Sequence, residues 1–399
     1  MFLLYNRTIL GGVMEKMIRG YVFRLYPTME QKILIEKSFG CYRYVYNYFL
    51  SKANCKGYIN KFDCIKELSL LSSTNEWLKE VDSCLLRCSI FSLEDALTAY
   101  KKGTSPYPKY KSKTRSRNSY RTSNFTREYK EKVYNSISIN LKDRTITLPK
   151  LKEVKIRGYR NLQKIDGKII NATIYKEASK YYVSLCVEEY REIEKQPIRK
   201  VVGIDLGIKE LLTTSDGIVI KNNRYIEKYE QKIKGLNKWL ARTKKGSKNR
   251  EKVKKKLAEV YRKLKNARKY FLHETSKRIV EENDLIVTEK LKINQMVQNK
   301  HLSKRIYDAS WYELIRELTY KSKWKGKACI QIDTYYPSSQ ECERCGYINK
   351  EVKDLNIRKW ECDNCHNENE RDINASINIM WKGLRKYVGS AEMHEMKVK

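Results

Sequence analysis

Lys-Val-Val-Gly-Ile-Asp-Leu-Gly, at residues 200–207, is the most informative segment of the chain. Val201–Leu206 is almost entirely apolar, which is typical of a strand buried on both faces of a sheet. Asp205 interrupts this apolar run, and burying a carboxylate is costly unless it is paired with a cation or bound to a metal. Gly203 and Gly207 flank the acid and would let backbone or phosphate approach closely. The segment therefore predicts a central strand that carries a functional acid.

The segments after this strand alternate between strands and helices, which predicts an α/β domain. Further strands are expected at Glu210–Thr214, Gly217–Ile220, Leu285–Glu289 and Ala328–Asp333. Helices are expected at Tyr225–Asn283, which is very basic and broken near Gly235 and Gly246, at Ser310–Lys325 and at Asp372–Leu384. The residues after Gly389 are expected to form a disordered tail.

Two further acids accompany Asp205. Glu289 ends the apolar strand Leu-Ile-Val-Thr-Glu, and Asp372 begins the last helix. In an RNase H-like fold these three carboxylates converge on the central sheet, where they would hold two Mg²⁺ ions about 4 Å apart. Singly, Asp205 could pair with a lysine, Glu289 could simply end a strand, and Asp372 could cap a helix. Their joint order along the chain favours the catalytic interpretation.

Four cysteines form the most specific single motif. Cys342-x2-Cys345 and Cys362-x2-Cys365 are separated by 16 residues. Two turns of this spacing can place four thiolates tetrahedrally around one structural Zn²⁺ ion, and this closed shell leaves no position for a reacting water. His366, next to the last cysteine, is expected to be a bystander. Two disulfides or free thiols are the alternative, which a reducing cytoplasm disfavours.

The composition indicates a nucleic-acid partner. The chain carries 83 Lys and Arg against 47 Asp and Glu, a net charge of +36. Such an excess repels itself in a compact fold unless a polyanion neutralises it. An AT-rich genome would explain the preference for Lys over Arg, but not the shortage of acids. No apolar run of membrane-spanning length is present, and residues 1–16 lack the features of a secretory signal, so we expect a cytoplasmic protein without a membrane partner.

The N-terminal half combines strand and helix patterns. Gly20–Tyr26 predicts a strand, and Thr28 with Gln31 three residues later predicts the start of a helix. Met29–Tyr100 has helical apolar spacing, interrupted at Gly57. Strands are expected at Ile137–Ile139, Thr145–Thr147, Val154–Ile156, Ile170–Tyr175 and Tyr181–Val187. Together these patterns predict a small β-barrel that is split in sequence by an inserted helical lobe.

Residues 101–124 are rich in glycine, proline and serine, which predicts a loop or linker. The loop carries a series of basic residues, namely Lys109, Lys111, Lys113, Arg115, Arg117 and Arg121. Tyrosines, among them Tyr120, lie between the basic residues. Basic groups bind phosphates while aromatic rings stack on bases, so we expect this loop to contact nucleic acid. A solvated, disordered basic loop is the alternative.

The chain resembles the TnpB family of transposon-encoded RNA-guided nucleases, which are related to the miniature type V CRISPR effectors. The motifs that carry this resemblance are GYVFRLYPTMEQ, CYRYVYNYFL, WLKEVD, YPKYKSK, GIDLGIKELLTTSDG, VTEKLKI, YYPSSQECERCG and RKWECDNC with RDINASINI. The resemblance implies an α+β multidomain protein. Its parts would be a split wedge β-barrel (17–27 and 125–195), a helical recognition lobe with the basic loop (28–124), a RuvC-like nuclease domain (200–337 and 369–388), an inserted zinc ribbon (338–368) and a disordered tail (389–399).

The resemblance also implies an activity and its partners. Asp205, Glu289 and Asp372 fall on the family's three catalytic positions, where two Mg²⁺ ions would bind, and the four cysteines fall on its zinc ribbon. A guide RNA derived from the right end of the transposon would direct the protein, as a monomer at the nucleoid, to double-stranded DNA next to a short adjacent motif. The charge of +36 fits a channel for an RNA–DNA heteroduplex.

Some positions depart from the family pattern. Asn369-Glu370-Arg371-Asp372 stands where the family usually has His-Asp-Arg-Asp, and Arg87 stands where glutamine is common. Activity could be altered by the first departure, and the second prevents the adjacent motif from being carried over. The alternatives are an RNA-guided DNA-binding repressor without cleavage, a dimeric miniature type V CRISPR effector, and a guide-independent junction nuclease. Each alternative can be distinguished from an RNA-guided DNA endonuclease. Plasmid cleavage tests the repressor, the genomic neighbourhood tests the dimeric effector, and co-purifying RNA tests the junction nuclease.

Overall fold

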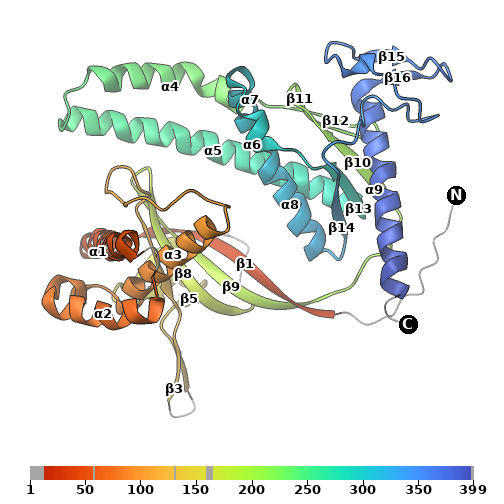
Figure 1. Ribbon diagram of the computed structural model, residues 1–399. Helices are drawn as coiled ribbons and strands as arrows, with labels where there is room; N and C mark the ends of the chain where they lie inside the picture. Colours follow the sequence, from red (N-terminus) through yellow and green to blue (C-terminus); the bar gives the residue numbers. More distant parts are fainter. Residues whose placement is uncertain (1–12, 57–58, 130–131, 159–164, 397–399) are drawn as a thin grey trace. The chain divides into compact units, whose positions relative to one another are not determined.

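The computed structural model of the chain describes residues 13–56, 59–129, 132–158 and 165–396, so the predicted break at Gly57 lies outside the described residues. The chain divides into two compact units, an N-terminal unit from Glu15 to Arg191 and a C-terminal unit that begins at Glu192. Figure 1 shows both units and labels many of their elements. Among the helices in these ranges, none combines the length and apolar composition that a bilayer crossing requires.

A seven-stranded sheet of order β2-β8-β9-β1-β7-β6-β5 forms the centre of the N-terminal unit. Its strands are β1 (Val13–Tyr26), β2 (Ser119–Ser123), β5 (Ser138–Asn140), β6 (Thr145–Leu148), β7 (Lys152–Arg157), β8 (Lys168–Glu177) and β9 (Lys180–Ile193). Burial alternates along β8 and β9 because successive side chains of a strand point to opposite faces. Within the described residues this sheet ends at β2 and β5, whereas the sequence predicted a barrel. Alternation gives the faces of each strand but not whether the outer strands pair.

The helices of this unit pack on the sheet. They are α1 (Met29–Lys56), α2 (Lys61–Thr74), the 3-10 helix η1 (Glu76–Glu80) and α3 (Ser83–Lys101). Thr28 and Gln31 exchange the two hydrogen bonds of a capping box at the start of α1, as the sequence predicted. Phe23 of the sheet and Phe39 and Ile90 of the helices are fully buried in one hydrophobic core. The predicted helical lobe and the sheet are therefore joined by shared packing.

Two features of the N-terminal unit were missed. The predicted loop at 101–124 ends in β2, which pairs with β8 through Tyr120 and Ile174. A hairpin of β3 (Thr126–Tyr129) and β4 (Lys132–Asn135) follows it and is labelled at β3 in Figure 1. Both segments are polar, and β2 acquires its partner only from a strand some fifty residues later, so local alternation does not reveal them.

A five-stranded mixed sheet of order β12-β11-β10-β13-β14 forms the centre of the C-terminal unit. Its strands are β10 (Val201–Leu206), β11 (Glu210–Thr214), β12 (Val219–Lys221), β13 (Leu285–Glu289) and β14 (Ala328–Ile332). β10, β13 and β14 run parallel, while β10, β11 and β12 are antiparallel neighbours. The predicted bounds of β10, β11 and β13 are confirmed to the residue.

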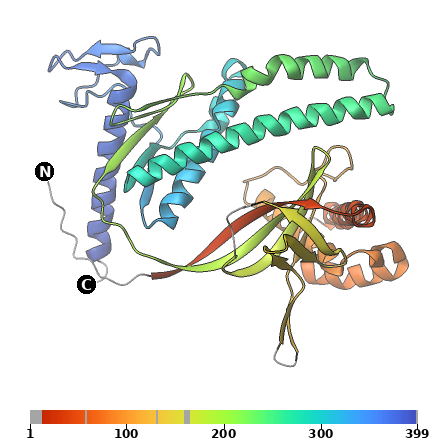
Figure 2. The same cartoon turned by 180° about the vertical axis from the view of Figure 1, so that it is seen from behind.

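Helices cover both faces of this sheet. The helices of the unit are α4 (Tyr225–Arg242), α5 (Lys248–Glu282), α6 (Ile293–Met296), α7 (Lys300–Ala309), α8 (Trp311–Trp324) and α9 (Arg371–Met396). α5 and α8 bury one face around Ile204 and Ile286, and α9 covers the other face around Val287. α4 and α5 lie side by side as a long hairpin (Figure 2). α9 approaches the sheet closely at Gly203, where a Cβ atom would lie 2.0 Å from the Ser376 carbonyl oxygen.

Several predicted boundaries in this unit are wrong. Gly235 lies inside α4, because an isolated glycine is tolerated in a helix, whereas Gly246 does occupy the turn between α4 and α5 with φ of 83°. The last helix continues to Met396, so residues 389–396 are helical rather than a disordered tail. α6 and α7 were not predicted, because the segment 293–309 combines many polar residues with few apolar ones.

Candidate active site and metal centre

Asp205 and Glu289 lie side by side at one edge of the C-terminal sheet. β10 and β13 are parallel neighbours, with Ile204 opposite Thr288. Asp205 and Glu289 follow these two residues, so continuing the same register places the two acids opposite each other on neighbouring strands. The sequence predicts Asp205 inside one apolar strand and Glu289 at the end of another, and the parallel pairing of the two strands supplies their proximity.

Asp372 reaches this edge from α9. The helix packs on β10, and Gly203 permits the closest contact, with Ser376 one turn after Asp372. The carboxylate of Asp372 is near enough to act electrostatically on Asp205, together with that of Glu289. The structure therefore brings the three predicted acids into one neighbourhood.

The electrostatics of this neighbourhood are unfavourable without a cation. Burial raises the pKa of Asp205 first, and the charges of Glu289 and Asp372 raise it further, to about 8. Burial also raises the pKa of Glu289, although the Ser338 hydroxyl donates a hydrogen bond of 2.5 Å to its Oε1 atom. Carboxylates that repel one another in a buried place are suited to a divalent cation with oxygen ligands. The residues present thus fit Mg²⁺ on charge and donor type.

The spacing of the acids also bears on this fit. Within the described residues, the three acids do not form a group whose ligand atoms all lie within 4.8 Å of one another. Oxygens bound to one Mg²⁺ ion at about 2.1 Å lie at most about 4.2 Å from one another. One ion would therefore not be held by all three acids without movement of a side chain.

Arg358 contacts the third acid and was missed by the sequence analysis. Its Nη1 atom donates to both carboxylate oxygens of Asp372, at 3.1 and 3.2 Å. Arg358 precedes β15 (Lys359–Glu361), so the contact ties the cysteine-bearing segment to the start of α9. A single arginine gives no signal in a chain with 83 Lys and Arg, which is why the pattern did not reveal it.

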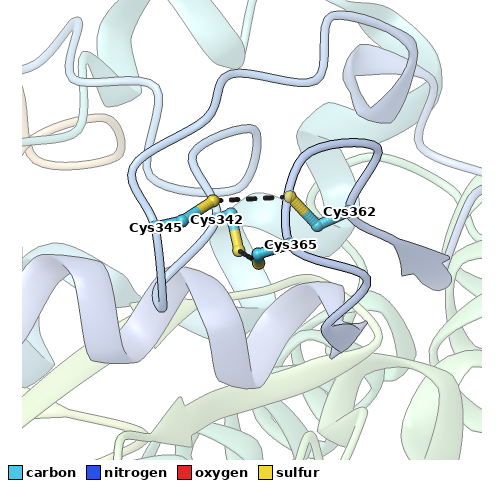
Figure 3. A group of neighbouring side chains, drawn as sticks. All are labelled: Cys342, Cys345, Cys362 and Cys365. Carbon is cyan, nitrogen blue, oxygen red and sulfur yellow. Dashed lines mark hydrogen bonds between the residues drawn. The ribbon is translucent and has the colours of Figure 1, made fainter.

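The four cysteines converge as the sequence predicted (Figure 3). Cys342 and Cys365 are 3.7 Å apart at their Sγ atoms, and Cys345 and Cys362 are 3.5 Å apart. All four are free, and these distances exceed the roughly 2.05 Å of a disulfide bond. Thiolates bound to zinc at about 2.3 Å in a tetrahedron lie about 3.8 Å from one another, so the cluster suits a structural Zn²⁺ ion.

Comparison with known proteins agrees with the geometry. Residues 184–300 match the OrfB_IS605 family described as a probable transposase, 311–379 match the Cas12f1-like TNB domain, and 14–56 match a helix-turn-helix domain, a range that holds β1 and α1 in the structure. A Streptomyces pristinaespiralis protein named "Putative RNA-guided DNA endonuclease" is 32% identical over 383 residues, which cover 93% of this chain and 91% of the relative. The chain belongs to the TnpB family.

Other relatives extend this TnpB assignment. InsQ of Escherichia coli K12, which carries the same description, is 26% identical over 390 residues and covers 92% of this chain and 93% of its own. The fold is similar to that in a cryo-EM structure of a Cas12f1–sgRNA–target DNA complex, with a TM-score of 0.54 and 12% identity over 92% of this chain and 99% of the other.

The two departures from the usual TnpB motif before α9, Asn369 and Glu370, contact the cysteine-bearing segment. Asn369 is buried in the cysteine cluster, where its Nδ2 atom donates to Cys342 Sγ at 3.9 Å. Glu370 pairs with Lys359 across β15 and β16 (Glu368–Glu370) at 3.1 Å. His366 lies on the surface, with Nδ1 at 2.9 Å from Glu361 Oε1. Asn369 and Glu370 therefore take part in the contacts of the ribbon in this structure.

The basic loop of this TnpB protein separates into anchored and exposed residues. Tyr120 is buried in the core of the N-terminal unit and packs on Phe39, so the prediction that its ring stacks on a base is wrong. The tyrosine lies on β2, where alternation turns it inward. Lys111 is half-buried, with its ammonium 3.6 Å from the Tyr46 ring centroid, and burial lowers its pKa to about 8. Asn47 pairs with both backbone groups of Lys111.

The remaining basic residues face outward to different degrees. Arg117 lies over the Tyr175 ring at 4.1 Å, and Arg121 is 3.9 Å from Asp95. The side chains of Lys109, Lys113 and Arg115 are exposed, as is that of Arg117. These four residues are therefore the best placed of the predicted set to meet phosphates.

Proposed function

We propose that this protein is an RNA-guided, Mg²⁺-dependent endonuclease that cleaves double-stranded DNA next to a short adjacent motif. The observation that carries the proposal is the convergence of Asp205, Glu289 and Asp372, with the pKa of Asp205 raised to about 8 by burial and by the other two acids. The mixed strand order of the C-terminal sheet, with the first acid on its central strand, supports an RNase H-like (RuvC) domain.

The charge distribution supports a nucleic-acid partner. Residues 225–282, which form the α4–α5 hairpin, hold 20 Lys and Arg against seven Glu. α4 contains no buried residue, so its basic side chains are available to a polyanion. The solved relative is a complex with an sgRNA and target DNA, which supports a guide RNA and a DNA target as the partners here.

In the proposed reaction, the three acids would hold two Mg²⁺ ions, which activate a water and stabilise the leaving oxygen of a phosphodiester. Ser338 donates a hydrogen bond to Oε1 of Glu289 and would position this carboxylate. Arg358 donates to both carboxylate oxygens of Asp372 and would position this acid at the site. The Zn²⁺ ion would act only by keeping the ribbon, and with it Arg358, in place.

Cleavage of a plasmid library tests the proposal. The protein is purified with its RNA, that RNA is sequenced to give the guide, and plasmids carrying the matching target beside randomised flanks are incubated with Mg²⁺. Wild-type protein is expected to cut a subset that shares a short flanking motif, and Asp205→Ala is expected to cut none. If wild-type protein, like Asp205→Ala, cuts no plasmid, cleavage is rejected and a repressor that only binds DNA is favoured.

Chromatography of the same complex addresses its assembly. We propose one protein chain per guide RNA, as the family resemblance implies. Light scattering of the purified complex is expected to give the mass of one chain of 47.5 kDa plus its RNA. A mass containing two chains would favour the dimeric effector.

A further inference from the structure

Lys292 and Tyr335 meet beside the candidate active site. β13 ends at Glu289 and β14 ends at Ile332, and these two residues are register partners on parallel strands. Lys292 lies three residues beyond the first strand end and Tyr335 three residues beyond the second. The Lys292 ammonium lies 4.6 Å from the Tyr335 ring centroid and donates to its hydroxyl.

The Tyr335 ring contributes little to the packing of the protein. Its side chain is 80% exposed, whereas the next residue, Tyr336, packs against the core of Val287 and Ile332. A single exposed tyrosine is common on protein surfaces, so exposure alone carries no inference. The position of this ring, at the acid-bearing edge of the sheet and beside a cation, distinguishes it.

The loop that displays Tyr335 also holds an acid of the site. Ser338, three residues after Tyr335, donates its hydroxyl hydrogen bond to Glu289. The same short segment thus fixes a metal-binding carboxylate and presents an aromatic face next to it. A group stacked on Tyr335 would be held at a set place relative to the acids.

We propose that Tyr335 and Lys292 form a binding platform for one nucleotide of single-stranded DNA beside the scissile phosphate. The base stacks on the free face of the Tyr335 ring, and the Lys292 ammonium binds a neighbouring phosphate. A base inside a duplex has both faces covered by its neighbours, so the platform accepts an unpaired strand in preference to a duplex. This inference rests on the proposed nuclease function and names two residues that would position the strand at the site.

Three variants separate the stacking ring from other effects. Tyr335→Phe keeps the aromatic face and loses the hydroxyl, Tyr335→Leu keeps apolar bulk and loses the face, and Lys292→Gln removes the charge. Because the Tyr335 ring is exposed, the melting temperature of each variant is expected to equal that of wild type.

The test uses the RNA-bound protein with Asp205→Ala, so that DNA stays intact, and a single-stranded DNA of about 20 nucleotides carrying 5-iodouracil. Light is expected to cross-link the DNA to Tyr335, and to the same position of the Tyr335→Phe protein because that variant retains the ring, but not to the Tyr335→Leu protein. Loss of stacking is expected to weaken binding by about 5- to 150-fold. Lys292→Gln is expected to reduce the slope of log affinity against log salt by about 0.7.

Two results would overturn the platform: cross-links that map elsewhere in the C-terminal unit, or equal binding by Tyr335→Leu and Tyr335→Phe. Single-turnover cleavage by the same variants with Asp205 intact keeps the two ideas apart. If wild type and Tyr335→Leu cut the target equally fast, the platform fails and the nuclease stands. If wild type does not cut at all, the nuclease proposal itself fails.

Discussion

At the scale of single residues, Asp205 shows why the acid site is strained without metal. Its folded pKa is about 8, well above its ordinary value of 3.8, first because of burial and then because of Glu289 and Asp372. An acid with a raised folded pKa destabilises the protein above its unfolded pKa, and this cost grows as the pH rises until the folded pKa is reached.

Asp205→Asn is therefore expected to stabilise the Mg²⁺-free protein while abolishing cleavage. The gain in the free energy of unfolding is expected to be small near pH 4 and to grow to several kcal/mol, on the order of 5, near pH 8, since each pKa unit corresponds to about 1.4 kcal/mol. Urea unfolding at several pH values in Mg²⁺-free buffer measures it. A gain that does not change with pH would contradict the electrostatic explanation.

Lys111 and Lys113 are two residues apart and have different environments. Lys111 lies against Tyr46 and its backbone is paired with Asn47, whereas Lys113 is exposed. Because burial lowers the pKa of Lys111 to about 8, its charged form costs free energy at neutral pH, and the cation–π contact offsets part of that cost. Lys111→Met is therefore expected to raise the free energy of unfolding at pH 7 and to raise it less above pH 8. Lys113→Met is expected to leave stability unchanged and to lower the salt slope of nucleic-acid binding by about 0.7–0.9. The reverse pattern would show that Lys111 is the phosphate contact.

At the scale of elements, an ionic network joins α5 to α8. Glu317 is fully buried, and its Oε2 atom accepts a hydrogen bond of 2.8 Å from the Ser276 hydroxyl. The same oxygen lies 3.0 Å from His273 Nδ1 and 3.4 Å from Lys321 Nζ. Burial alone would raise the pKa of Glu317, but the bonds from His273 and Ser276 and the charge of Lys321 together lower it. Its stabilising effect is thus present above its unfolded pKa and is lost as the pH falls through the lower folded pKa.

Glu317→Ala is expected to reduce the free energy of unfolding by about 3–5 kcal/mol at neutral pH, because it leaves Lys321 partly buried without its partner. The double variant Glu317→Met, Lys321→Met is expected to recover most of that loss by packing apolar side chains in the same space. Chemical denaturation of the two variants measures both values. A double variant as unstable as the single one would argue that the network contributes more than the sum of its charges.

The elements also show what could be predicted from the sequence. β10, β11 and β13 were predicted to the residue because their apolar runs end at clear turn or acid signals. β2 and α7 were missed because their stabilising partners are distant in sequence and their own residues are polar. The cysteine cluster and the three acids were predicted by spacing and order, whereas Arg358 and the inward turn of Tyr120 depend on tertiary pairing that spacing does not contain.

At the scale of the whole molecule, the ribbon and the acid site are linked through Arg358. The ribbon's own core is small, with Val352 and Trp360 beside Cys342 and Cys362. Such a small core needs a metal to stay folded.

Mass spectrometry of the native protein is expected to show one Zn²⁺ per chain. Cys362→Ser is expected to lose the metal and most cleavage with little change in the melting of the N-terminal unit, and full activity without zinc would contradict the link.

The two compact units have separate hydrophobic cores, which leads to a prediction about folding. The core around Phe23, Phe39 and Ile90 lies wholly within Glu15–Arg191, and the cores around Ile204 and Val287 lie wholly in the C-terminal unit. Because each core is complete within one unit, residues 13–193, cut after the end of β9, are expected to fold alone.

Cooperative urea unfolding and dispersed amide NMR signals of this fragment measure whether it folds. A fragment ending at residue 179, which lacks the interior strand β9 between β8 and β1, is the matched control and is expected to be unfolded. If the longer fragment is also unfolded, the N-terminal core requires the C-terminal unit or bound RNA in order to fold.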